Sequence, residues 1–230
     1  GFAQLLDVVG FNYRTHKYVS AYDILPQKLL LGSETASTVS SRGVYKLPAE
    51  LRHGAVYPDS QCSSYDLEYC WWSNIPDIDF AMQDDYDWTI GQFVWTGFDY
   101  LGEPTPYDVD AWPSHSSYFG IFDLASLPKD RYWLYRSQWR HDSPTLHLLP
   151  HWSWEGKEGE KVPVMCYTSY PMAELFVNGV SQGVRRFDAS DTLSRYRLIW
   201  PDVVYEPGEI EVVAFDAAGF ERQREKIRTA

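Results

Sequence analysis

The sequence predicts two domains of different fold class, a parallel α/β sheet or barrel over residues 1–142 and an antiparallel β-sandwich over residues 143–230. In the first segment, apolar residues stand in near-continuous runs separated by helical patterns, which is typical of parallel strands covered on both faces by helices. In the second segment, apolar and polar residues alternate with period two. The pattern changes near Asp142-Ser143-Pro144, where we place the domain boundary.

Three apolar runs of the first domain are expected to form adjacent parallel strands, over residues 7–13, 28–33 and 89–95. Helical patterns separate or follow them at residues 21–27, 79–86 and 129–139. In the last pattern, the spacing places Arg131, Arg136 and Arg140 on a polar side and turns the aromatic residues, including Trp139, toward the core.

The second domain is expected to contain short strands over residues 161–168, 173–177, 180–184, 193–200 and 209–215. Asn178-Gly179 stands between two of these alternating runs. Both residue types tolerate a positive φ, so this pair predicts a tight hairpin turn.

Composition narrows the classes of partner. The chain carries a net charge of −12, which argues against a nucleic-acid partner and against docking on anionic membrane surfaces. No apolar run approaches the roughly 20 residues that span a bilayer. Aromatic residues make up 17% of the chain, and they either stack on sugar rings or fill the core.

No residue pattern indicates a metal or another cofactor, and we expect none. Cys62, Cys70 and Cys166 have no zinc spacing, and the first two could pair or stay as idle thiols. The histidines are scattered and no phosphate-binding loop occurs. No signal-peptide pattern is visible at the N-terminus, and the compartment stays open between the periplasm and the cytoplasm.

Glu34 is the strongest catalytic candidate. It stands just past the second predicted strand, and catalytic groups of parallel barrels project from the C-terminal ends of strands. A carboxylate there can attack an anomeric carbon and form a covalent glycosyl-enzyme. The alternative is that Glu34 stabilises the N-terminus of a following helix through its charge.

The other strand ends supply further candidates. Asn12 and Tyr13 end the first strand, and the Tyr13 phenol could hold the nucleophile by a hydrogen bond or be an ordinary half-buried tyrosine. Trp95 ends the third strand and could form the floor of a sugar subsite or belong to the core.

The loops after the third strand supply three candidates for substrate binding. Asp99 and Glu103 could bind sugar hydroxyls or pair with arginines. His115 lies among local hydroxyl residues, without partners at metal-ligand spacing.

Four segments, taken in order, resemble family 2 glycoside hydrolases of the bacterial β-galactosidase kind: GFNYR, LLLGSETAS, GQFVWTGFDYLGEP and SHSSYFGIFDLASLPKDRYWLYRSQW. The later segments LHLLPHW and AELFVNGVSQG resemble the immunoglobulin-like domain that follows the barrel in that family. The resemblance implies the C-terminal part of a (β/α)8 TIM barrel, strands six to eight, followed by an immunoglobulin-like β-sandwich. It implies that Glu34 is the nucleophile, Tyr13 the tyrosine beside it, and Trp95 a residue lining the galactose subsite.

A retaining glycosidase needs a second carboxyl as acid/base, and in this family that Glu follows an Asn. No Asn-Glu pair occurs in the 230 residues. We therefore expect a fragment of a retaining β-galactosidase that hydrolyses terminal β-galactosides by double displacement in the intact protein and is inactive by itself.

Two alternatives stay open for the activity. The first is another specificity of the same family, β-glucuronidase or β-mannosidase. The second is a non-catalytic carbohydrate-binding or assembly module. In each case the expected partner is a carbohydrate, and a barrel cut before its sixth strand is expected to self-associate through bare strand edges.

Overall fold

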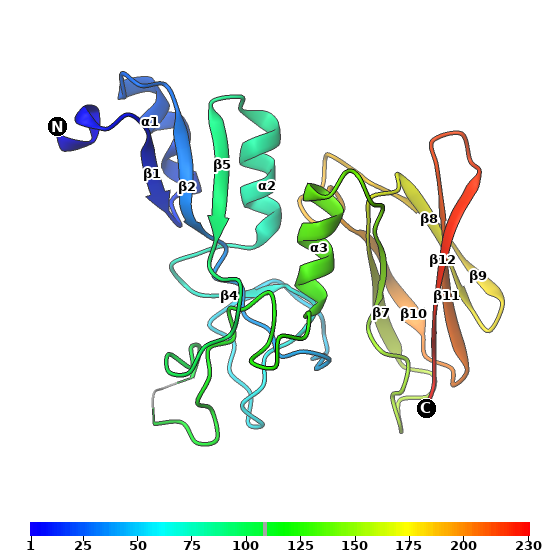
Figure 1. The fold of residues 1–230 in the computed structure, drawn as a ribbon. Helices are drawn as coiled ribbons and strands as arrows, with labels where there is room; N and C mark the ends of the chain where they lie inside the picture. Colours follow the sequence, from blue (N-terminus) through cyan, green and yellow to red (C-terminus); the bar gives the residue numbers. More distant parts are fainter. Residues whose placement is uncertain (108–109) are drawn as a thin grey trace. The chain divides into compact units, whose positions relative to one another are not determined.

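The computed structural model describes residues 1–107 and 110–230 and divides the chain into two compact units (Figure 1). Unit 1 consists of Gly1–Ser41 and Glu50–Leu127, and unit 2 of Arg42–Ala49 and Pro128–Ala230. Each unit has its own buried apolar cluster.

Unit 1 contains a parallel sheet of three strands in the order β1-β2-β5 (Figure 1). The strands are β1 (Val9–Asn12), β2 (Leu30–Thr35) and β5 (Thr89–Val94), and both pairings are parallel. The predicted adjacency of these three parallel strands is confirmed. That they are strands six to eight of a barrel stays a prediction.

Helices α1 (Tyr18–Ile24) and α2 (Pro76–Asp85) both begin earlier than the sequence pattern predicted. Pro76 stands at the first turn of α2, where its fixed φ suits the helix and its missing N–H leaves no bond unmade. The remaining elements of unit 1 are short: η1 (Phe2–Leu5), η2 (Thr15–Lys17), β3 (Arg52–His53) and β4 (Glu68–Tyr69). The long segment before α2 is therefore mostly irregular.

The core beside the sheet is tightly packed around β2. Leu30 is fully buried and clusters with Val9, Tyr18, Ala21 and Leu25. A Cβ added at Gly32 would lie 2.6 Å from Cγ2 of Thr35 and 3.1 Å from the hydroxyl of Tyr18. Glycine at this position lets helix α1 approach the strand closely.

Unit 2 is a two-layer antiparallel sandwich. One sheet has the order β10-β7-β6 and the other β12-β11-β8-β9. The strands are β6 (Leu146–Leu149), β7 (Lys161–Thr168), β8 (Met172–Val177), β9 (Val180–Arg186), β10 (Leu198–Val204), β11 (Glu209–Phe215) and β12 (Glu221–Arg228). Apolar residues from both sheets form one buried cluster that contains Trp152 and Trp200.

The Asn-Gly signal in the second domain is confirmed. Asn178 and Gly179 connect β8 to β9 with φ of 48° and 80°. Strand β10 begins five residues later than predicted, because two backbone hydrogen bonds form turns just before it. Arg195 N–H donates to the Asp191 carbonyl at 3.0 Å, and Tyr196 N–H donates to the Leu193 carbonyl at 3.2 Å.

Strand β12 was not predicted, because its sequence is almost entirely polar. It pairs with β11, and oppositely charged side chains face each other across the pair. Lys226 lies 2.7 Å and Arg228 2.8 Å from carboxylate oxygens of Glu209. Such cross-strand pairs give an exposed ladder a modest stabilisation, roughly 0.2–1 kcal/mol each.

Helix α3 (Asp130–Trp139) differs from its predicted facing. Arg131 is only 1% exposed, whereas Trp139 is 46% exposed, so the assignment of both side chains was wrong. The helix packs on β6 and β7, which places it in unit 2. The compact units thus divide near residue 128, while the assignment of 1–142 and 143–230 as barrel and sandwich domains stays a prediction.

Asp79 on α2 is a buried carboxyl with no compensating cation described around it. It is 3% exposed, and neither side-chain oxygen has a hydrogen-bond partner among the described residues. Burial raises the pKa of Asp79 to about 8, the charge of Asp77 adds to the rise, and Asn74 opposes it in part. The protonated form therefore dominates in the folded protein at neutral pH.

We predict that Asp79→Asn reduces the pH dependence of stability. The unfolded chain releases this proton near pH 4 and the folded protein near pH 8, so stability falls as pH rises between these values. We compare the free energy of unfolding of the variant with that of the original protein. This difference should shift in favour of the variant by on the order of 2 kcal/mol between pH 5 and pH 8. Urea unfolding followed by circular dichroism at both pH values measures this. The exposed control Asp87→Asn should follow the original protein, and parallel behaviour of all three would contradict the prediction.

We also predict self-association through unit 1. Strands β1 and β5 are the outer strands of the described sheet, and Phe93 on β5 is 65% exposed. Bare edges and exposed apolar residues recruit another chain. Light scattering should show a dimer that Phe93→Lys weakens. Phe220→Lys in unit 2, where Phe220 is 68% exposed, is the matched control. A monomer at every concentration, without binding of a hydrophobic dye, would refute this.

Candidate active site

The candidate site lies at the carboxyl end of the parallel sheet, where β1 and β2 finish together. Asn12 pairs with Glu34 in the parallel register, after an irregularity between Phe11 and Asn12. Glu34 is the penultimate residue of β2, so the strand extends further than predicted and includes it. Tyr13 directly follows β1 and therefore emerges beside Glu34.

Two hydrogen bonds join Tyr13 to Glu34. The Tyr13 hydroxyl donates to Oε2 of Glu34 at 2.8 Å, and the Tyr13 backbone N–H donates to the Glu34 carbonyl at 3.0 Å. Tyr13 has a φ of 56°, an uncommon conformation for a bulky residue and one that clusters at functional sites. The backbone and the side chain of Tyr13 thus fix the carboxylate together.

The Tyr13 phenol is held in its neutral form. Burial raises the pKa of Tyr13, the Glu34 carboxylate raises it further, and the nearby Ser37 hydroxyl lowers it in part. A neutral phenol keeps its proton and can therefore donate the hydrogen bond that orients the Glu34 carboxylate.

Asn12 and Thr35 flank the pair with contacts of their own. The Ser33 hydroxyl donates to Oδ1 of Asn12 at 2.7 Å on the exposed side. The Thr35 hydroxyl donates to Oε1 of Gln92 on β5 at 2.6 Å. The second bond ties β2 to its other neighbour, and the sequence analysis did not anticipate it, because a single Gln in an apolar strand carries no pattern.

Trp95 begins the loop that leaves β5. Its N–H donates to the Thr35 carbonyl at 3.0 Å, which places its backbone one residue from Glu34. Its ring is half-buried, packs near Val39 and Phe119, and meets the ring of Tyr100 edge-on at 6.1 Å. These contacts suit a wall of the site as well as a core position.

Asp99 has a contact with the backbone. Its Oδ1 accepts the Gly120 N–H at 2.7 Å, and its own N–H donates to the Phe122 carbonyl at 2.9 Å. A Cβ at Gly120 would lie 2.2 Å from the Asp99 nitrogen, so the two segments approach closely. Asp99 thereby holds two loops together, and its contact with sugar hydroxyls stays a prediction.

Glu103 and His115 come from different parts of the loop after β5 but line the same pocket. The pocket has a volume of about 440 Å³ and is lined by Leu101, Gly102, Glu103, Pro104 and His115. Oε2 of Glu103 accepts a hydrogen bond from the Tyr100 hydroxyl. The Trp112 ring meets the His115 ring edge-on at 4.5 Å. Trp112 carries no sequence signal of a functional residue.

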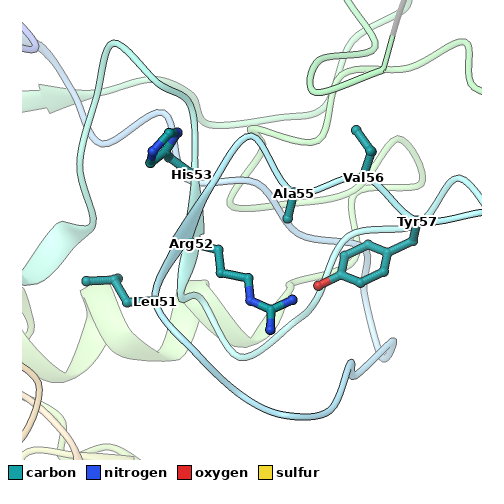
Figure 2. Close-up of a pocket in the computed structure, with 6 residues that line it drawn as sticks. All are labelled: Leu51, Arg52, His53, Ala55, Val56 and Tyr57. Carbon is teal, nitrogen blue, oxygen red and sulfur yellow. The ribbon is translucent and has the colours of Figure 1, made fainter.

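A second pocket, of about 380 Å³, is formed by one continuous stretch, Leu51–Tyr57 (Figure 2). Two of its polar side chains, Arg52 and Tyr57, already have partners within the protein. Nη2 of Arg52 lies 2.7 Å from a Glu50 carboxylate oxygen, and the Tyr57 hydroxyl donates to Glu68. Because its charge and its hydroxyl are engaged, this pocket is the weaker candidate for a ligand.

The described residues contain no cluster of three or more His, Cys, Asp or Glu that could hold a metal ion. All three cysteines are free and buried, so Cys62 and Cys70 do not pair. Within the part of the chain that the structure describes, no helix has the length and apolar character to cross a membrane.

Comparisons with known proteins show which proteins the chain resembles. A family model described as "Domain of unknown function (DUF4982)" matches residues 159–222. The β-galactosidase BoGH2A of Bacteroides ovatus is 40% identical over 96% of this chain and 26% of its own length. A β-glucuronidase of Bacteroides fragilis is 30% identical over 52% of this chain and 16% of its own. The crystal structure of a β-glycosidase from Bacteroides vulgatus matches 98% of this chain and 31% of its own, with 31% identity and a TM-score of 0.79. The chain thus spans about a quarter of the length of the B. ovatus relative.

Proposed function

We propose that this chain, which belongs to glycoside hydrolase family 2, carries the nucleophile of a retaining β-galactosidase, Glu34. In the intact protein, β1, β2 and β5 would be the last parallel strands of a TIM barrel, and unit 2 would include the immunoglobulin-like domain that follows the barrel in the sequence. The activity would be hydrolysis of terminal β-galactosides.

The pairing of Glu34 with Tyr13 carries this proposal. The carboxylate stands at the carboxyl edge of a parallel sheet, where barrel enzymes place their catalytic groups. The phenol binds Oε2 at 2.8 Å, so Oε1 is the oxygen that can approach an anomeric carbon. A carboxylate oriented by a neutral donor is poised for nucleophilic attack.

The chemistry follows from two carboxyls about 5–5.5 Å apart. Glu34 attacks the anomeric carbon, the glycosidic C–O bond breaks, and the acid/base carboxyl gives its proton to the leaving oxygen. Water, deprotonated by the same group, then displaces Glu34 with a second inversion, so the configuration is retained. The sequence has no Asn-Glu pair, and we propose that another part of the protein supplies the acid/base.

Similarity and charge both favour a galactoside over a glucuronide. The match to the β-galactosidase of B. ovatus extends over nearly the whole chain, while the match to the β-glucuronidase of B. fragilis extends over half. A glucuronidase must also bind the carboxylate of its sugar, and Asn12, Tyr13 and Trp95 carry no positive charge. β-Glucuronidase and β-mannosidase activity are the alternatives within the family.

A non-catalytic carbohydrate-binding or assembly module is the alternative from a different class. The family model of unknown function matches only residues of the sandwich, which is the observation that favours it. Carbohydrate binding that survives Glu34→Gln without any covalent chemistry in the longer protein would support this alternative.

We predict that the 230-residue chain alone hydrolyses no aryl β-galactoside above background. General acid assistance typically contributes a factor of 10²–10⁴, and the proposed acid lies outside this chain. Release of nitrophenol from a 4-nitrophenyl β-galactoside measures the rate. Turnover that disappears in Glu34→Gln and persists in Glu50→Gln would show that these residues include the acid.

We predict that a 2-deoxy-2-fluoro-β-galactosyl fluoride labels Glu34 in the full-length protein. The fluorine slows both steps, while the good leaving group lets the covalent ester form and accumulate. Mass spectrometry of the peptide that contains Glu34 should show the added sugar, and Glu34→Gln should remain unlabelled. Labelling of another carboxylate would sink the assignment of the nucleophile.

A further inference from the structure

We propose that the pocket lined by Leu101–Pro104 and His115, here called the loop pocket, binds the sugar ring of the leaving group. This inference rests on the proposed function, since it extends the substrate beyond the ring that Glu34 attacks. It assigns substrate specificity to Trp112, Glu103 and His115 together.

Backbone contacts hold the two segments that line the loop pocket together. An antiparallel bridge joins Leu101 to Ser116, and the Gly102 N–H donates to the His115 carbonyl at 2.8 Å. The volume of about 440 Å³ falls within the range of roughly 300–1,000 Å³ that small-molecule sites occupy. The backbone therefore presents a concave surface of the size of a sugar ring with its substituents.

Two polar groups of the loop pocket are available to a ligand. The Tyr100 hydroxyl fixes Oε2 of Glu103, and Oε1 has no hydrogen bond among the described residues. Glu103 and Gly102 have φ of 45° and 84°, and a non-glycine residue held in this region often serves a site. Likewise, the described residues give no hydrogen bond to the ring nitrogens of His115.

Trp112 supplies an apolar surface beside these groups. It is 78% exposed, and Leu101 in the same loop is 77% exposed. The His115 ring contacts it edge-on and so helps to fix its orientation. An exposed indole beside hydrogen-bonding groups fits a pyranose, whose C–H face stacks on the ring while its hydroxyls meet the carboxylate and the imidazole.

A chain of contacts connects the loop pocket to the candidate nucleophile. The backbone N–H of Trp95 donates a hydrogen bond to the carbonyl of Thr35, the residue after Glu34. The Trp95 ring contacts the Tyr100 ring edge-on, and the Tyr100 hydroxyl donates to Glu103. Figure 1 shows that the loop after β5 leaves the carboxyl end of the sheet. A sugar ring attacked by Glu34 would lie against this end, and its leaving group would point toward the loop.

The charge of the loop pocket selects the chemistry of the leaving group. Glu103 repels an anionic aglycone and accepts hydroxyl hydrogen bonds, while Trp112 favours a ring over a linear alcohol. The fitting ligand is a neutral sugar, such as the glucose ring of lactose.

Saturation-transfer NMR of the 230-residue chain with lactose tests binding directly. Protons of the glucose ring should receive the larger transfer, and Trp112→Ala should reduce it at least fivefold. Trp71→Ala is the matched control, because Trp71 is 77% exposed in the same unit. Melting curves of both variants confirm that they fold. Transfer that is absent, or that is unchanged in Trp112→Ala, would overturn the proposal.

Kinetics of the full-length protein separate this inference from the proposed function. Galactosyl fluoride has no leaving-group ring, so the ratio of kcat/KM for lactose to that for galactosyl fluoride should fall about tenfold in Trp112→Ala. The ratio should stay constant in Trp71→Ala. A constant ratio in both variants would refute the loop pocket. Absence of any turnover of galactosyl fluoride would refute the β-galactosidase proposal instead, and the NMR result alone would then decide the loop pocket.

Discussion

The parallel register of β1 on β2 is the constraint on which the candidate site depends. It sets Asn12 opposite Glu34, so the residue after β1 emerges beside the carboxylate. Parallel strands require a crossover, and α1 provides it by packing against β2 at the position where Gly32 leaves room for the Tyr18 hydroxyl. A side chain at this glycine would collide with the Thr35 methyl group, 2.6 Å away, and would press on the Tyr18 hydroxyl at 3.1 Å. Thr35 directly follows Glu34, so this close packing lies beside the candidate nucleophile.

The sequence predicted the features that depend on the spacing of apolar residues and on the residues at the ends of strands. The three parallel strands and the Asn-Gly hairpin were predicted because long apolar runs and a turn pair are local signals. Glu34 and Tyr13 meet as the resemblance and the strand-end rule implied. Strand β12 and the burial of Arg131 were missed, because both depend on partners distant in sequence: the acidic side chains of β11 in the first case and the sandwich in the second. Hydrophobic pattern alone cannot report a polar residue that finds its partner only in the fold.

The loop residues of the candidate site also have roles that the sequence alone could not distinguish. Asp99 and Glu103 were equivalent in the sequence, two carboxylates after one strand. The fold separates them, because Asp99 holds the Gly120 backbone while Glu103 turns into a pocket through a left-handed backbone conformation. Trp112 gave no signal, since an aromatic residue is as often core as surface. Only its exposure beside His115 distinguishes it.

In this arrangement, one part of unit 1 carries the proposed nucleophile and another part selects the leaving group of the substrate. The carboxylate is fixed by backbone hydrogen bonds of a parallel sheet, including the 3.0 Å bond from Tyr13, and such contacts tolerate few substitutions. The two segments of the loop pocket are joined by backbone hydrogen bonds, from Gly102 to His115 and from Ser117 to Tyr100, so its side chains can change without moving Glu34. A rigid sheet edge with variable loops is how barrel enzymes keep one chemistry while they change substrates. On this argument, substitutions at Trp112 or Glu103 alter which leaving group is accepted, whereas substitutions at Gly32 or Tyr13 alter whether the nucleophile is correctly placed at all.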